Sequence, residues 1–355
     1  MRSIPRAGWA AHGFFGFAAK TFGNPSGATS GDGSLVPPGP PAVTPVVWTF
    51  RAQPTSGGAP VYAMASDTAG RTILVDTSGA VQVSTDGGHT WTGAGLISPF
   101  TIFSGSPRGM LVASDGVWIL SGANGVGGSS YFRSINNGVT WVPIVGLASA
   151  LGTDGAGTWV STPADSPLPP ADYQISVTNG LTWASTGVTT IGGEFMLPIL
   201  WNGTEFVLFS VDSAGTFFPT IWTSPDGATW TPFSNNSSVQ SWGFPLFAGG
   251  VYYATDQQAA NVYTGASIDA LNNAPPIPTN LTGGSLLLGR TAAGQFFAFD
   301  TVGNVANTNP GSFSAWALGT PNFAMAGESG NQLCYDVVND SLIVGGNLGS
   351  ICTVP

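Results

Sequence analysis

The sequence feature that most constrains the fold is an octapeptide that returns along the chain. It reads STDGGHTW at residues 84–91, SINNGVTW at 134–141, SVTNGLTW at 176–183 and, one residue shorter, SPDGATW at 224–230. Each copy follows an apolar alternating run and precedes another, which is the layout of a β-hairpin with a polar, glycine-containing turn. Recurrence at a period of about 40–50 residues predicts a propeller or a solenoid.

The octapeptide resembles the Asp-box, or bacterial neuraminidase repeat, whose pattern is S-x-D-x-G-x-T-W. The first copy matches every position, whereas the second and third carry Asn136 and Thr178 where the pattern has an acid. In families that share this repeat, it caps the turn between the third and fourth strands of a propeller blade. The resemblance therefore implies a β-propeller.

The repeated residue types suit a turn rather than a catalytic site. Serine and aspartate can accept hydrogen bonds from the turn's own amides, glycine tolerates positive φ, and tryptophan can bury a large surface between blades. Replacing the acid by Asn or Thr would abolish an acid catalyst but not a turn. We predict structural roles for Ser84, Asp86, Gly88, Trp91, Ser134, Asn136, Gly138, Trp141, Ser176, Gly180, Trp183, Ser224, Asp226 and Trp230.

The spacing of the tryptophans predicts the number of blades. Trp48, Trp91, Trp141, Trp183, Trp230 and Trp316 each stand where an outer strand is expected to begin. Successive tryptophans are separated by about 40–50 residues, the length of one blade, except that Trp230 and Trp316 are separated by about twice that length. One blade therefore lacks the tryptophan that marks its outer strand. Residues 261–275 fill that place, with Ser267 and Asp269 as a degraded turn. Seven positions predict seven blades.

The two ends of the chain are expected to build the last blade together. Residues 332–355 align strand for strand with residues 62–84, but stop after the third strand. The fourth strand is available in PVVWTFRA, residues 45–52, and its insertion would remove an open sheet edge. Cys334 and Cys352 would then lie on the first and third strands, too far apart for a disulfide, as two buried thiols. We expect an all-β propeller over residues 45–355.

Residues 1–44 precede the propeller as an extended arm and linker. The piece 8–23, GWAAHGFFGFAAKTFG, is rich in aromatic and small residues, and a linker rich in proline, glycine and serine follows it. We expect no signal peptide, because His12 and several glycines interrupt the apolar region. The aromatic residues could fill a partner's groove or fold back over the propeller; they are Trp9, Phe14, Phe15, Phe17 and Phe22.

Composition excludes some classes of function. Charged residues make up 7% of the chain and the net charge is −10, so the basic stripe of a nucleic-acid-binding protein is absent. No apolar run is long enough for a membrane span. Glutamate occurs only at 194, 205 and 328, which disfavours a helical fold and supports an all-β one.

The families that share the Asp-box include sialidases and other glycoside hydrolases, so the resemblance raises the question of catalytic residues. A sialidase needs an arginine triad and a tyrosine nucleophile paired with a glutamate, and none of the glutamates stands beside a tyrosine. The candidate arginines are Arg51, Arg71, Arg108, Arg133 and Arg290, in no recognisable context. Another hydrolase needs two carboxylates about 5–10 Å apart. The candidates are Asp115, Asp154, Asp165, Asp172, Asp212 and Asp300, although turn formation is the commoner role. We predict no catalytic site, cofactor or metal, since His12 and His89 cannot form a metal cluster.

Long, mostly uncharged loops are expected to crown the propeller at residues 96–107, 162–172, 233–245 and 274–283. Their asparagines, serines and aromatics suit contacts with sugars or with another protein. The aromatic candidates for binding are Phe100, Phe217, Phe218 and Trp242.

In style, with low charge, polar β modules and an N-terminal anchor, the chain resembles a bacteriophage tail or virion-appendage protein. This resemblance implies a non-enzymatic component present in several copies. Its arm would dock on other virion proteins, and its propeller would contact host-surface glycan or neighbouring proteins. One alternative is a secreted sialidase-like glycoside hydrolase, which would be extracellular rather than part of a virion. A second alternative is a lectin-type or assembly-factor propeller.

Overall fold

The computed structural model describes most of the chain after residue 47. The described residues are 43, 48–52, 54–98, 100, 110–114, 116–124, 128–145, 150–161, 172–189, 194–196, 199–212, 220–233, 242–243, 245–256, 260–281, 287–300, 304–309, 315–319 and 330–354. Among them, no helix has the length and apolar character needed to cross a membrane. Residues 1–42 and 44–47 lie outside this set, so the boundary between arm and propeller at residue 44 stays a prediction.

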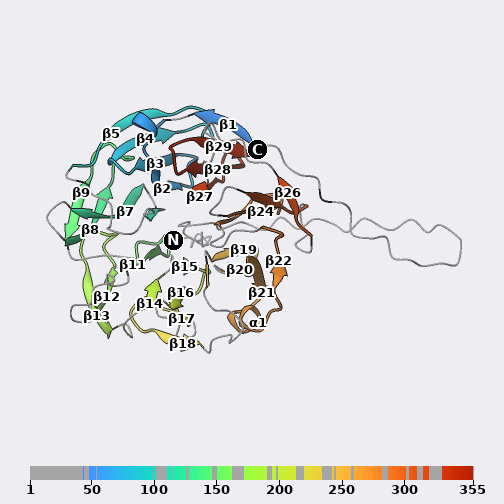
Figure 1. The fold of residues 1–355 in the computed structure, drawn as a ribbon. Helices are drawn as coiled ribbons and strands as arrows, with labels where there is room; N and C mark the ends of the chain where they lie inside the picture. The colour runs from blue at the N-terminus through green and yellow to red at the C-terminus, as the bar shows by residue number, and fades with distance from the viewer. Residues whose placement is uncertain are drawn as a thin grey trace, which may run out of the picture.

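Seven antiparallel sheets follow one another around a ring, as the blades of a β-propeller (Figure 1). Blade 1 contains β2 (Val61–Ser66), β3 (Thr72–Asp76), β4 (Ala80–Ser84) and β5 (Thr92–Leu96). Blade 2 contains β6 (Leu111–Ser114), β7 (Val117–Asn124), β8 (Gly128–Ser134) and β9 (Val142–Val145). Blade 3 contains β10 (Leu151–Thr153), β11 (Trp159–Ser161), β12 (Asp172–Ser176) and β13 (Ala184–Thr189).

Blade 4 has a divided innermost strand, because β14 (Glu194–Met196) and β15 (Leu200–Trp201) both pair with β16 (Phe206–Asp212). Its outer strands are β17 (Ile221–Ser224) and β18 (Thr231–Phe233). Blade 5 contains β19 (Leu246–Ala248), β20 (Val251–Thr255), β21 (Asn261–Gly265) and β22 (Ile277–Pro278). Blade 6 contains β23 (Leu287–Arg290), β24 (Phe296–Phe299), β25 (Val305–Asn307) and β26 (Ala317–Gly319).

Blade 7 is built from both ends of the chain, as the sequence predicts. Its strands are β27 (Gly330–Asp336), β28 (Ser341–Gly346), β29 (Ile351–Val354) and, as the outer strand, β1 (Thr49–Ala52). In the antiparallel pairing of β1 with β29, Thr49 is opposite Thr353 and Phe50 is opposite Cys352. A short 3₁₀ turn, η1 (Ser56–Gly58), leads from β1 into blade 1. The ring is therefore closed by a strand from the N-terminal side.

The strands are ordered by burial from the inside of each blade to its rim. All residues of β2, β3 and β28 are buried, because neighbouring blades cover both of their faces. The outer strand β5 is largely exposed and is made of threonine, glycine, alanine and leucine. Inner strands accordingly read as continuous apolar runs, which is the pattern of strands buried on both faces.

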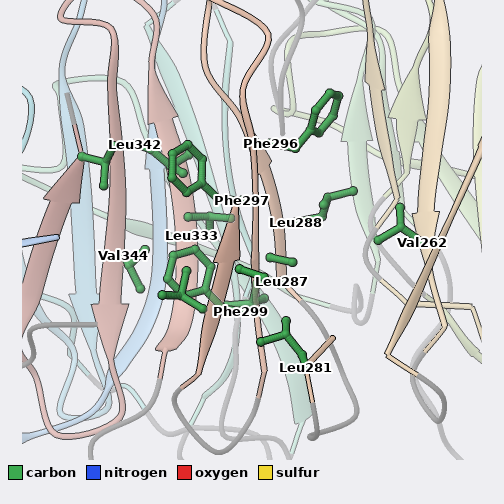
Figure 2. Packing of buried hydrophobic residues seen from close by; sticks show 14 of the residues in the cluster. Val262, Leu281, Leu287, Leu288, Phe296, Phe297, Phe299, Leu333, Leu342 and Val344 are labelled. Carbon is green, nitrogen blue, oxygen red and sulfur yellow. The ribbon is translucent and has the colours of Figure 1, made fainter. Parts of the chain in front are cut away.

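The largest core cluster joins blades 5, 6 and 7. Figure 2 shows part of it, in which Phe297 and Phe299 of β24 lie in one cluster with Leu333 of β27 and Leu342 of β28. Trp48, at the start of β1, packs edge-on against Phe297 and Phe299, with ring centroids 5.4 and 4.8 Å apart. The strand that closes the ring is thereby fixed to blade 6 as well as to blade 7.

The two cysteines occupy the strands expected for them. Cys334 lies in β27 and Cys352 in β29, and both are free and buried. They belong to different core clusters, so their side chains are packed on different neighbours. Burial raises the pKa of the Cys334 thiol to about 12, which keeps it protonated and unreactive at neutral pH.

The tryptophan markers lie immediately before outer strands, as predicted for all six. In blade 5, where the marker is missing, a short helix α1 (Ile268–Asn272) occupies the connection between the third and fourth strands. Ser267 caps it by accepting a hydrogen bond from the Ala270 amide at 3.1 Å. The expected degraded turn is thus a capped helical turn.

Candidate functional site

The first octapeptide forms a turn held by its own side chains. The buried Ser84 Oγ accepts a hydrogen bond from the Gly88 amide at 2.9 Å and donates to Asp86 Oδ1 at 2.8 Å. Asp86 in turn accepts from the Thr90 amide at 2.9 Å and from the Thr90 hydroxyl at 2.6 Å. The indole of Trp91 donates to the Gly88 carbonyl at 3.0 Å. Ser84, Asp86, Thr90 and Trp91, the polar side chains at the fixed positions of the pattern, are all hydrogen-bonded within the turn.

The acid can be replaced without changing this geometry. In the second turn Asn136 Oδ1 accepts from the Thr140 amide at 2.9 Å, and in the third Thr178 Oγ1 accepts from the Thr182 amide at 2.8 Å. The serines and tryptophans of the other three turns make the same bonds as in the first turn. The Ser134, Ser176 and Ser224 hydroxyls accept from the amides of Gly138, Gly180 and Gly227, respectively. The indoles of Trp141, Trp183 and Trp230 donate to the carbonyls of the same three glycines. The motif is a structural element of the turn.

Hydrogen bonding also determines the ionisation of the turn acids. Partial desolvation raises the pKa of Asp86, but the bonds from Thr90 and Ser84 outweigh it and lower the pKa to about 2. The Thr229 amide lowers the pKa of Asp226 in the same way. These carboxylates are therefore ionised at neutral pH and cannot serve as general acids.

Each turn packs against the preceding blade through its glycine. A Cβ on Gly88 would lie 3.2 Å from Ile343 of blade 7, and one on Gly138 would lie 2.8 Å from Ile73 of blade 1. The same relation joins Gly180 to Ile119, at 2.4 Å, and Gly227 to Val160, at 2.5 Å. These glycines also have positive φ, so both the space and the backbone exclude a larger residue. The turns connect neighbouring blades.

Strand direction divides the propeller into two faces. Within each blade, the first-to-second and third-to-fourth connections lie at one end of the sheet, which we call the turn face. The second-to-third connections and the links between blades lie at the other end, which we call the loop face. The described strands on either side of the predicted long loops 96–107, 162–172 and 233–245 end or begin at the loop face. The fourth, 274–283, is partly outer strand, because residues 277–278 form β22.

The aromatic binding candidates in the described part of the chain are packed into the core. Trp242 is 0% exposed and lies edge-on to Phe209 and Tyr263, at centroid distances of 5.9 and 5.4 Å. Phe100 is half-buried against Tyr62 and Phe132. Trp242 therefore has no free ring face for a ligand, contrary to its proposed role. The other candidates, Trp9, Phe14, Phe15, Phe17, Phe22, Phe217 and Phe218, lie outside the described residues.

Two of the candidate acids are turn formers. Asp154 accepts from the amides of Ala156 and Thr158 at 2.8 and 2.9 Å. The buried Asp300 accepts from the backbone and side chain of Asn304, both at 2.7 Å. Asp76 is a further turn former that the sequence analysis did not single out. It is fully buried at the end of β3, much as Asp300 directly follows β24, and it accepts a hydrogen bond from the Ser78 amide at 2.8 Å. Its position between an apolar strand and a glycine-containing turn is the sequence pattern that could have identified it. Asp115, Asp165 and Glu328 lie outside the described residues.

The described arginines are distributed over four blades and do not converge. Arg51 of blade 7 donates to the Thr353 hydroxyl at 2.7 Å, and Arg133 of blade 2 donates to the Asn179 carbonyl of blade 3 at 3.1 Å. Arg71 of blade 1 pairs with Asp67 at 3.3 Å and bonds Asn137 of blade 2. Arg290 of blade 6 lies over the ring of Phe296, 5.6 Å from its centroid. They form no carboxylate clamp, and three of them contribute bonds between blades or strands.

Strand register pairs two acidic positions of blade 4. Glu194 of β14 is directly opposite Asp212 of β16, at the end of these strands that meets the loop face. Sequence reasoning treated these two residues separately, because only the ladder makes them neighbours. Asp172 of β12 is opposite Thr189 instead. Glu205 accepts a hydrogen bond from Asn202 at 3.4 Å. No group of three or more metal-ligating side chains occurs among the residues that the structure describes.

Comparison with known proteins establishes the fold alone. No family model matches the chain, so the likeness to the Asp-box repeat rests on the turn residues, and no curated protein matches it. Among solved structures, "YCF48 bound to D1 peptide" has a TM-score of 0.62 and 15% identity, over 87% of this chain and 95% of that one. A catalytically inactive virginiamycin B lyase from Staphylococcus aureus with quinupristin has a TM-score of 0.62 and 8% identity, over 87% and 98%.

A GH74 xyloglucanase from Xanthomonas campestris is also similar, with a TM-score of 0.59 and 13% identity. The match covers 87% of this chain but 53% of the enzyme, so this chain spans about half of that protein's length. The similar structures thus include enzymes and a peptide-bound propeller. The seven-bladed fold does not by itself distinguish catalysis from binding.

Proposed function

We propose that this protein is a non-catalytic binding propeller, which serves as a structural component of a bacteriophage tail or other virion appendage. The observation that carries the proposal is the use of charged side chains. In the part of the chain that the structure describes, Asp86, Asp154, Asp226, Asp300, Arg51, Arg71 and Arg133 all contribute bonds to turns, strands or adjoining blades. The sequences of the long connections, by contrast, are mostly uncharged.

In this proposal the loop face is the binding face. Its connections are rich in asparagine, serine and aromatic residues, which suit a glycan or a protein surface. The solved structure of YCF48 with D1 peptide supports the idea that a propeller of this kind can hold a peptide. The arm, residues 1–44, would attach the propeller to neighbouring virion proteins, in several copies per particle.

The test of this docking role is removal of residues 1–44 from the chain in the virus that encodes it. We expect the truncated propeller to fold but to be missing from purified particles, as measured by quantitative mass spectrometry of the virion. Normal incorporation of the truncated chain would refute the docking role of the arm.

A glycoside hydrolase is the second candidate, favoured by the register pair of Glu194 and Asp212. These two acidic residues are paired in the antiparallel ladder between β14 and β16. Retaining glycosidases use carboxyl groups about 5–5.5 Å apart. A panel of polysaccharides and sialosides should show no turnover by the purified protein. Turnover that disappears in both Glu194→Gln and Asp212→Asn would replace the binding proposal with this one.

A further inference from the structure

The turn face carries exposed apolar side chains that the turns themselves do not require. Ile135 and Val139 of the second turn, Val142 of β9, and Val177 and Leu181 of the third turn are between 55% and 74% exposed. We call these five residues the turn-face patch. Turns one and four have Thr85, His89, Pro225 and Ala228 at the matching positions, so the hydrogen-bonded motif tolerates small or polar residues there.

The patch lies on the turns of two neighbouring blades, and the guanidinium groups of Arg71 and Arg133 bond these turns at Asn137 and Asn179. The third turn is bonded to blade 2 by Arg133, which donates to the Asn179 carbonyl, and by the contact of Gly180 with Ile119. No charged residue occurs in SINNGVTW or SVTNGLTW. Exposed apolar side chains that cluster on a folded surface mark an interaction site, whereas scattered ones do not.

Strand β1 begins at this same face. Trp48 precedes β1 as Trp91, Trp141 and Trp183 precede their outer strands, so the chain enters β1 at the end of blade 7 where other blades have a turn. Val337 and Val338, in the turn between β27 and β28, are exposed on the turn face of that blade. Blade 7 neighbours blade 1, whose turn packs against Ile343 through Gly88.

We propose that, in the free protein, residues 8–23 of the same chain bind the turn-face patch. This segment contains Trp9, Phe14, Phe15, Phe17 and Phe22, so it offers a large apolar area to the exposed apolar side chains of the two turns, and its aromatic rings can also pack on the neighbouring guanidinium groups. The contact goes beyond the docking role proposed for the arm, and it stands whether or not a virion is the partner.

The linker is long enough for this contact. From Phe22 to Trp48 the chain can span about 85 Å when extended, at about 3.3 Å per residue. Packed sheets are separated by about 10 Å and diverge toward the rim, so three blade steps lie within reach. A tethered segment also has an effective concentration of about a millimolar, which favours it over an untethered partner of equal affinity.

The test is hydrogen–deuterium exchange of the full-length protein, followed by mass spectrometry of peptides from residues 8–23. The double variant Val177→Ser, Leu181→Ser removes both exposed apolar side chains of the third turn without touching the turn's hydrogen bonds. Leu318→Ser is the matched control, because this side chain is 54% exposed on β26, away from the patch. Thermal unfolding of each protein confirms that the propeller is intact.

We expect exchange in residues 8–23 to be slowed at least about tenfold relative to an unstructured peptide, a difference of roughly 1.4 kcal/mol. The double variant should restore fast exchange, and Leu318→Ser should not. Fast exchange in the unaltered protein, or slow exchange that survives the double variant, would overturn the proposal. Slowing that grows with protein concentration would also overturn it, since it would assign the contact to a second copy.

Discussion

At the residue scale, the serine of each octapeptide is the residue on which the turn depends most. Ser84 is buried and serves both as the acceptor for the Gly88 amide and as the donor to Asp86. The acid is interchangeable with other short acceptors, because Asn136 and Thr178 accept the equivalent amide bonds. The sequence pattern therefore ranks the serine and the glycine above the acid that gives the repeat its name.

This ranking predicts the effect of two substitutions in the first turn. Ser84→Ala should lower the free energy of unfolding by about 1–3 kcal/mol, because it leaves the Gly88 amide buried without its acceptor. Asp86→Asn should cost much less, since the second turn already uses asparagine. Chemical denaturation of both variants measures the difference. Equal losses would contradict the view that the acid is interchangeable.

The same turn predicts a component of acid sensitivity. The pKa of Asp86 is lowered from 3.8 to about 2 in the folded protein, so its carboxylate stabilises the fold above about pH 4. That contribution is lost as the pH falls from about 4 toward 2. Asp86→Asn should flatten the pH dependence of the unfolding free energy in this window. Burial raises the pKa of Asp67, so the titration of Asp67 changes the unfolding free energy in the opposite direction. The comparison is therefore made in an Asp67→Asn background. If Asp86→Asn leaves the pH slope unchanged in that background, Asp86 does not have this role.

At the element scale, the outer strands are positioned by what precedes them. In four blades this is an octapeptide turn, in blade 5 it is helix α1, and in blade 7 it is Trp48 alone. The tryptophan spacing could locate these strands because a large indole before a short polar strand is a distinctive local pattern. The helix could not be foreseen, because Ser267 and Asp269 suit a turn and an N-cap equally well.

The element that closes the ring should be stabilised mainly by Trp48. It is buried against Phe297 and Phe299 of blade 6, so Trp48→Ala should cost about 3–5 kcal/mol. Leu318→Ala, at an exposed outer-strand position, should change stability by no more than about 0.5 kcal/mol. Denaturant unfolding compares the two. A loss at Trp48 no larger than that at Leu318 would mean that β1 is held without its tryptophan.

At the scale of the whole molecule, the sequence was sufficient for the architecture and insufficient for the site. Blade number, closure and the separation of the cysteines followed from patterns repeated along the chain. The burial of Trp242 did not, because its sequence neighbours are mostly polar. Trp242 is buried and forms an isolated β-bridge with Asp256, a contact between residues that are not adjacent in the sequence. The opposition of Glu194 and Asp212 likewise depends on strand register rather than on local sequence.

The ring closes only if the N-terminal strand β1 and the C-terminal strand β29 meet in blade 7. The direct test is Phe50→Cys, which places a thiol opposite Cys352, where paired Cα atoms are close enough for a disulfide. After mild oxidation and proteolysis, we predict one disulfide-linked species joining the peptides that contain residues 50 and 352, absent from Leu318→Cys. Failure to recover that species from folded, oxidised protein would contradict the closure of the ring.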